Sequence, residues 1–130
     1  MSISIEAAPR VVAEDLADPS THSDWATEFI DGPPLEVRED GSVVVNIPAM
    51  GGPSRFKVEA DLDRGILDLY LAPGDVPFGP PLPVRLVANG DGVDVLWVLS
   101  RPAMMDDEQW VTAQDSMARE LENLKTRHEA

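Results

Sequence analysis

The stretch VDVLWVLSRPAMMDDEQWVTAQDSMARELENLK, residues 93–125, joins two hydrophobic periodicities that decide the fold. In its first part, apolar residues fall on every second position, as in a strand with one buried face. In its last part, apolar residues recur at spacings of three, four and seven, as on one face of a helix: Trp110, Met117, Leu121 and Leu124. Pro102 ends the strand, and Asp106 and Gln109 have capping-box spacing. The sequence therefore predicts a last strand, a short loop and a long helix from Asp106 to about His128.

Upstream of this stretch, the sequence predicts a strand at residues 2–6 and a helix that begins at Pro9 and ends near Ala17. A second short helix is expected from an N-cap at Ser20, through Trp25, to about Phe29. Turn signals then separate six strands, at residues 35–39, 43–48, 55–61, 66–71, 84–88 and 93–100. The order of strand, two short helices, six antiparallel strands and one long helix predicts an α+β fold.

Alternation along these strands predicts one apolar face and one largely polar face of the sheet. Apolar residues at alternate positions are expected to point inward, from Leu35 and Val37 in the first of the six strands to Trp97 in the last. Polar residues fall on the opposite parity: Arg55, Lys57, Asp68, Tyr70, Arg85 and Asp94. We expect the apolar stripe of the long helix to cover the apolar face, and no strand to supply an inward acid, base or hydroxyl. This pattern weighs against catalysis.

Composition excludes several classes of partner. The 130 residues include 24 acids and 10 bases, giving a net charge of −14, which argues against nucleic acid and anionic lipid surfaces. The chain has no cysteine, no signal-peptide pattern and no apolar run near the roughly 18 residues of a membrane span. The two histidines lie too far apart for metal-ligand spacing. We expect one cytoplasmic domain, residues 1–130, without stable membrane insertion, metal or cofactor.

Two segments resemble the START/Bet v 1-like superfamily, also called SRPBCC or polyketide cyclase/dehydrase-like proteins: SISIEAAPRVVAEDLADPSTHSDWA, residues 2–26, and residues 93–125. The resemblance implies a helix-grip fold, in which a curved antiparallel sheet wraps around a long C-terminal helix. Members include lipid and hormone carriers, aromatase/cyclases, hydrolase-like enzymes, chaperone activators and ubiquinone-binding proteins. The fold alone therefore leaves the activity open.

Within that fold, the sequence favours binding of a small hydrophobic molecule, lipid- or polyketide-like, between the sheet and the C-terminal helix. Tryptophans suit a flat ligand, Gln114 offers a hydrogen bond, and Arg101 offers a contact to a ligand carboxylate. The predicted ligand-binding residues are Phe56, Phe78, Trp97, Arg101, Met104, Met105, Trp110, Gln114 and Met117. Whether Trp97 and Trp110 line a cavity or only fill the core is left open.

The connections at 49–53, 72–83 and 100–105 should lie at one end of the sheet, where their apolar residues suggest an entrance. Met104 and Met105 would form either a lip of this entrance or a plug. Trp25 is expected in the core, His22 on the surface and His128 at a frayed helix end.

Two other functions stay open. One is a cyclase or dehydratase-type enzyme in which Gln114 or Arg101 makes the polar contact. The other is a non-catalytic protein-interaction module that uses the outer sheet face or the acidic surface, and a homodimer is also left open.

Overall fold

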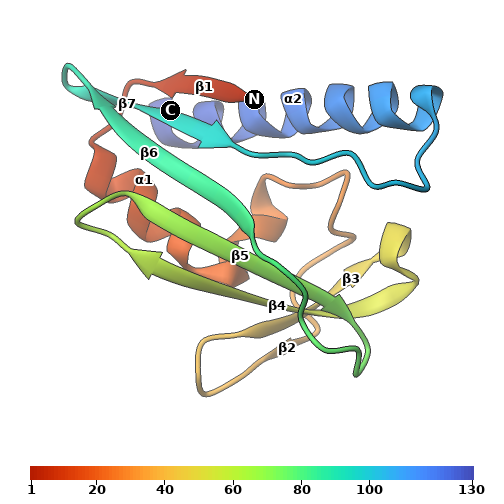
Figure 1. Ribbon diagram of the computed structural model, residues 1–130. Helices are drawn as coiled ribbons and strands as arrows, with labels where there is room; N and C mark the ends of the chain where they lie inside the picture. Colours follow the sequence, from red (N-terminus) through yellow and green to blue (C-terminus); the bar gives the residue numbers. More distant parts are fainter.

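The computed structural model describes residues 1–130 and contains one seven-stranded antiparallel sheet with the strand order β1-β7-β6-β5-β4-β3-β2. The elements are β1 (Ser2–Ile5), α1 (Pro9–Ala17), the 3₁₀ helix η1 (Pro19–Asp24), β2 (Glu36–Val37), β3 (Val43–Ile47), the 3₁₀ helix η2 (Pro48–Met50), β4 (Gly52–Asp61), β5 (Ile66–Pro73), β6 (Leu82–Asn89), β7 (Gly92–Trp97) and α2 (Asp107–Glu129). The predicted order of elements and the helix-grip architecture are confirmed. Figure 1 shows α2 running along the β1 and β7 end of the curved sheet.

The two edges of the sheet are the first two strands of the sequence, β1 and β2. β1 pairs with β7, so that Ser2 lies opposite Leu96, while β2 forms the other edge. The connection between β1 and β2 crosses from one edge to the other and carries α1 and η1. All later strands follow as hairpins, in the register that the alternation predicts, with Phe56 opposite Leu71 and Val84 opposite Trp97.

Inward-facing residues of β3 to β7 form one apolar core with α1 and α2. Val43, Val45, Leu67, Val84 and Val95 are fully buried, as the alternation predicts. The alternation of apolar positions by itself overestimates burial at the hairpin ends. Ala60 and Ala88 are exposed there because β4 and β6 extend past the core. Ser54 supplies one inward hydroxyl that the sequence did not predict, and it donates to the carbonyl of Gly52 at 3.0 Å.

Three predicted elements are wrong in extent. β2 contains only Glu36 and Val37, and the side chains of Leu35 and Val37 are 59% and 65% exposed because this edge strand pairs on one side only. β7 ends at Trp97 instead of Ser100. The second short helix is the six-residue η1, capped by Asp18, whose carboxylate accepts from the backbone N–H of Ser20 at 3.0 Å.

The long helix α2 begins where the sequence predicts. The carboxylate of Asp106 accepts from the backbone N–H of Gln109 at 2.7 Å, and the Gln109 side chain accepts from the Asp106 N–H at 3.0 Å. This capping box satisfies two of the free N–H groups at the start of the helix. The helix is not apolar enough to cross a membrane, and neither is any other.

The C-terminal end of α2 is fixed, although the sequence analysis predicted that it would be frayed. Arg127 and His128 both contact the carboxylate of Asp15 in α1, at 2.9 and 2.8 Å. Burial opposes the charge of Asp15, but the hydrogen bond and charge of Arg127, together with the hydrogen bonds of Thr21 and His128, outweigh it, and the pKa of this carboxyl lies below its ordinary value. α2 is therefore capped at one end and tied to α1 at the other.

Candidate functional site: a cavity between the sheet and α2

A cavity of about 620 Å³ lies between the inner face of the sheet and α2. Its walls come from β4 to β7, from residues 25–30, from the loop between β7 and α2, and from α2 itself. Fifteen of the 25 lining residues are hydrophobic, and the volume falls in the range of small-molecule pockets. The predicted cavity is therefore present and mostly apolar.

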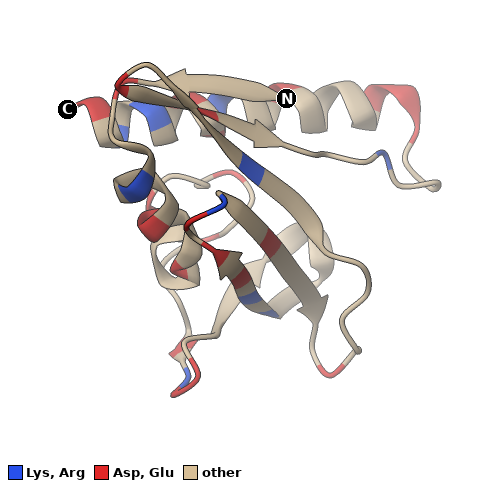
Figure 2. Ribbon diagram, turned by 60° about the vertical axis from the view of Figure 1, so that its left-hand side comes forward, with Lys and Arg blue, Asp and Glu red and all other residues tan.

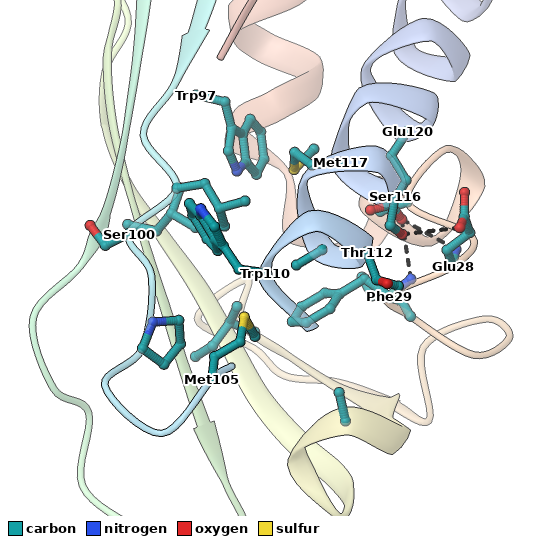
Figure 3. A pocket seen from close by; sticks show the side chains of 18 of the residues that line it. Glu28, Phe29, Trp97, Ser100, Met105, Trp110, Thr112, Ser116, Met117 and Glu120 are labelled. Carbon is teal, nitrogen blue, oxygen red and sulfur yellow. Dashed lines mark hydrogen bonds between the residues drawn. The ribbon is translucent and has the colours of Figure 1, made fainter. Parts of the chain in front are cut away.

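Five of the predicted ligand-binding residues line this cavity: Phe56, Trp97, Met105, Trp110 and Met117. Figure 3 shows Trp97 and Met117 pointing into the space between sheet and helix, with Trp110 and Met105 nearer the loop. Trp97 and Met117 are 6% and 8% exposed, whereas Trp110 is only half-buried. Trp97 thus belongs to the core and also lines the cavity, whereas Trp110 lines the cavity without belonging to the core.

Gln114 lies outside the cavity, contrary to expectation. Each helical residue turns the chain by about 100°, so the side chains of Ala113, Ser116 and Glu120 share one arc, and this arc faces the cavity. Gln114 is turned away from that arc, toward the side on which Leu121 packs into the core. The apolar stripe indicated the buried side of the helix, while the cavity lies against the more polar side next to it.

Arg101 and Met104 also lie outside the cavity. The guanidinium of Arg101 donates to the backbone carbonyl of Met105 from Nε at 3.2 Å and from Nη2 at 3.0 Å, and Nη1 pairs with Asp107 at 2.8 Å. These contacts fold the loop so that Met105 turns inward, while Met104 is 95% exposed. Of the two methionines, only Met105 belongs to the site.

Phe78 lies on the opposite face of the sheet. Its ring packs edge to face with Tyr70, with centroids 6.0 Å apart, and the Arg55 guanidinium carbon lies 4.6 Å from the ring centroid. Arg55 also donates to the carbonyls of Gly74 and Val76, so it holds the loop 72–83 against the polar face. Of residues 72–83, only Leu82 lines the cavity, so most of this loop does not border the site as expected. Ala49 of η2 and the loop after β7 also line the cavity.

His22 lines the cavity and was missed by the sequence reasoning, which placed it on the surface. The side chain is 2% exposed, and its Nε2 lies 2.8 Å from the carbonyl oxygen of Leu16. Its ring lies 4.8 Å from that of Phe56 and 6.5 Å from that of Trp97, centroid to centroid. Burial lowers the pKa of His22 to about 4, so the ring is neutral at pH 7. The three-residue spacing from His22 to Trp25 was the available signal.

The hydrogen bond to Leu16 determines the tautomer of His22. A carbonyl oxygen only accepts, so the hydrogen is on Nε2 and the lone pair is on Nδ1. Nδ1 makes no hydrogen bond within the protein. The only unpartnered side-chain polar atom sealed from solvent is the indole nitrogen of Trp25, so Nδ1 is not sealed. His22, a lining residue of the cavity, therefore carries an acceptor nitrogen that has no partner within the protein.

Glu120 is a second polar lining residue that the sequence reasoning missed. It is 3% exposed, and Oε2 accepts from the backbone N–H groups of Glu28 at 3.2 Å and of Phe29 at 3.1 Å (Figure 3). Burial raises the pKa of this carboxyl, although the two N–H groups oppose the shift. Its position on the inner arc, three residues after Met117, was a signal, but the helix is so rich in acids that it did not stand out.

Glu28 ties the segment before β2 to α2. Its carboxylate pairs with Arg119 at 2.6 Å and accepts from the Ser116 hydroxyl at 3.0 Å. The lining as a whole holds four acids, Glu28, Asp106, Glu108 and Glu120, and no lysine or arginine. Figure 2 shows the acidic first turn of α2 and one basic position in the loop before it. The basic residue of this loop, Arg101, pairs with Asp107 and does not line the cavity.

No family model matches the sequence, and no curated protein matches it. Solved structures do match. The Aha1 dimer from Colwellia psychrerythraea is 21% identical with a TM-score of 0.66, over 99% of this chain and 93% of that one. A START superfamily protein from Mycobacterium smegmatis is 17% identical with a TM-score of 0.59, over 99% and 94%.

A further similar structure is larger. The di-domain ARO/CYC StfQ from the steffimycin biosynthetic pathway is 12% identical with a TM-score of 0.60, over 99% of this chain and 44% of that one. At these identities the likeness establishes the fold, not the activity. The protein has the helix-grip fold of the START/Bet v 1-like superfamily.

Proposed function

We propose that the protein binds a small hydrophobic molecule, lipid- or polyketide-like, in the cavity between the sheet and α2. The observation that carries this proposal is the cavity of about 620 Å³ with its apolar lining. Proteins of the same fold include one named as a START superfamily protein and one named as an ARO/CYC of a biosynthetic pathway, which supports a small-molecule role.

The lining explains how affinity would arise. Burial of apolar surface contributes about 25 cal/mol per Å², so about 200 Å² of ligand surface removed from water is worth roughly 5 kcal/mol before the cost of association. Trp97 and Trp110 offer large rigid surfaces, and Met105 adapts its shape because its side chain is unbranched.

Native mass spectrometry of freshly purified protein tests the proposal first. We expect a fraction of the protein to carry a co-purifying mass that is lost on denaturation. An apolar fluorescent probe should also bind with one-to-one stoichiometry and quench the tryptophan emission. Absence of both signals would contradict the proposal.

Trp110→Ala should weaken binding of such a probe about tenfold or more, because it removes one wall of the cavity. The matched control is Val111→Ala, which changes an exposed residue on the same helix turn and should bind the probe as the unaltered protein does. Equal effects of the two substitutions would assign Trp110 no part in the site.

A second candidate is an enzyme of the cyclase or dehydratase type, favoured by one observation. His22 of η1 and Glu120 of α2 place a neutral imidazole and a carboxyl of raised pKa on the cavity wall. The sequence had predicted only that the strands supply no inward polar group. Mass spectra separate the two functions. A binding protein returns its co-purified molecule unchanged after incubation, whereas a dehydratase would return it lighter by one water. The same spectra report whether the protein is a monomer or a homodimer.

A further inference from the structure

We propose that the cavity selects an uncharged, flat apolar molecule whose hydroxyl donates to Nδ1 of His22, and that it rejects carboxylates. This inference rests on the proposed function and specifies the chemistry of its ligand. Three properties of the lining carry it: its charge, the free acceptor on its one buried neutral polar side chain, and its aromatic inner wall.

The charge of the lining excludes a carboxylate. No lysine or arginine lines the cavity, while four acids do. Two arginines adjoin lining residues in the sequence, and both are already paired with acids: Arg119 with Glu28, and Arg101 with Asp107. A carboxylate that entered would lose its hydration without gaining a cation, in a protein whose net charge is already −14. A fatty acid or another organic anion is therefore a poor ligand for this site.

The free acceptor is Nδ1 of His22. The lining has two buried polar residues, and the other one, Glu120, is an acid whose Oε2 accepts two backbone N–H groups. His22 is therefore the buried lining residue that offers a neutral acceptor. Nδ1 has no partner, because the Leu16 carbonyl takes the Nε2 hydrogen. A ligand hydroxyl would complete the hydrogen bonding of His22, whereas a purely hydrocarbon ligand would displace water and leave Nδ1 unpaired.

The surroundings of His22 favour a flat ring beside that hydroxyl. The ring of Phe56 stands edge-on to His22 at 84°, and Trp25 and Trp97 stand edge-on to each other at 85° with centroids 5.5 Å apart. These rings form a rigid wall at the inner end of the cavity. Rigid aromatic walls suit flat ligands because stacked and edge-to-face contacts need no rearrangement of either partner.

Three probes with one ring system test the inference: 1-pyrenemethanol, 1-methylpyrene and 1-pyrenecarboxylate, titrated at pH 7 by energy transfer from the tryptophans. We expect 1-pyrenemethanol to bind about tenfold more tightly than 1-methylpyrene, the ratio that one hydrogen bond supplies. 1-Pyrenecarboxylate should bind most weakly. Binding of the carboxylate as tight as that of the alcohol would overturn the inference while leaving the proposed function intact. Failure of all three probes to bind would overturn the proposed function itself.

His22→Phe gives the second arm, because it keeps a ring and removes the acceptor. In this variant the alcohol and the methyl compound should bind equally, and a surviving preference would overturn the inference. A measurement on the unaltered protein does not depend on the variant folding. The ¹⁵Nδ1 resonance of His22 should shift with 1-pyrenemethanol and much less with 1-methylpyrene, and equal shifts would contradict the assigned contact.

Discussion

At the residue scale, His22 is the side chain that most changes the chemistry of the interior. It is a titratable group held neutral beside the cavity, with one nitrogen bonded to Leu16 and the other without a partner in the protein. The sequence did not reveal it because η1 is a 3₁₀ helix, whose tighter turn changes which side of the segment faces the sheet. The prediction of an α-helix from Ser20 therefore placed His22 on the surface.

Burial of His22 predicts a pH dependence of stability. Its pKa is about 4 in the folded protein, against an ordinary value of 6.5, so between these values the unfolded chain takes up a proton that the folded chain refuses. The free energy of unfolding should fall as the pH falls from 6.5 to 4, by up to about 3 kcal/mol from this group. Urea unfolding at several pH values, on the unaltered protein and on His22→Phe, measures it.

The comparison between the two proteins isolates His22. Carboxyls of lowered pKa, such as Asp15 and Glu129, lose their stabilising effect at lower pH in both. The variant should therefore show the shallower decline between pH 6.5 and 4. Parallel curves would mean that the pKa of His22 is not depressed.

Two substitutions at Glu120 should differ in their effect on the free energy of unfolding. Glu120→Ala leaves the N–H groups of Glu28 and Phe29 without an acceptor, and should lower the free energy of unfolding by about 1–3 kcal/mol. Glu120→Gln keeps an oxygen for both N–H groups and removes a buried carboxyl of raised pKa, so at pH 7 it should be neutral or stabilising. Chemical denaturation of both variants checks this, and equal losses would contradict the proposed role of the acceptor.

At the element scale, α2 and β2 show what local sequence can and cannot predict. The start of α2 was predictable because a capping box and an apolar stripe are local patterns, read within a few residues of each other. The exposure of Leu35 and Val37 was not, because it depends on β2 being an edge strand. The position of Phe78 depends likewise on a distant residue, Arg55, which fixes the loop 72–83. Local patterns thus indicated the elements, and long-range contacts decided which loops border the site.

The capping box of α2 can be tested directly. Asp106→Ala should lower the free energy of unfolding by about 1 kcal/mol, the usual loss on removing an N-cap side chain. Because Asp106 follows Met105 and also lines the cavity, probe binding should weaken as well. Asp115→Ala, on the exposed side of the same helix, is the matched control and should change neither. A stable Asp106→Ala protein would show that the cap does not hold this end of the helix.

At the scale of the whole molecule, the excess of acids opposes compactness. A net charge of −14 on 130 residues creates self-repulsion that salt screens, whereas the surface ion pairs that salt weakens contribute little individually. The midpoint of thermal unfolding should therefore rise between about 10 mM and about 150 mM sodium chloride. Scanning calorimetry at the two concentrations, with an uncharged osmolyte as control, measures this, and a falling midpoint would show that the ion pairs dominate.

The pairing of β1 with β7 affects the order in which parts of the molecule can fold during synthesis. Ser2 meets Leu96, so β1 must wait until β7 has been synthesised before its hydrogen bonds form. Such pairing between distant residues slows folding, because a long loop must close first. The walls supplied by β7 and α2 are also synthesised after those supplied by β4 to β6. A growing chain that has not yet reached α2 therefore lacks one wall of the site, and a small molecule can be enclosed only after α2 has been synthesised.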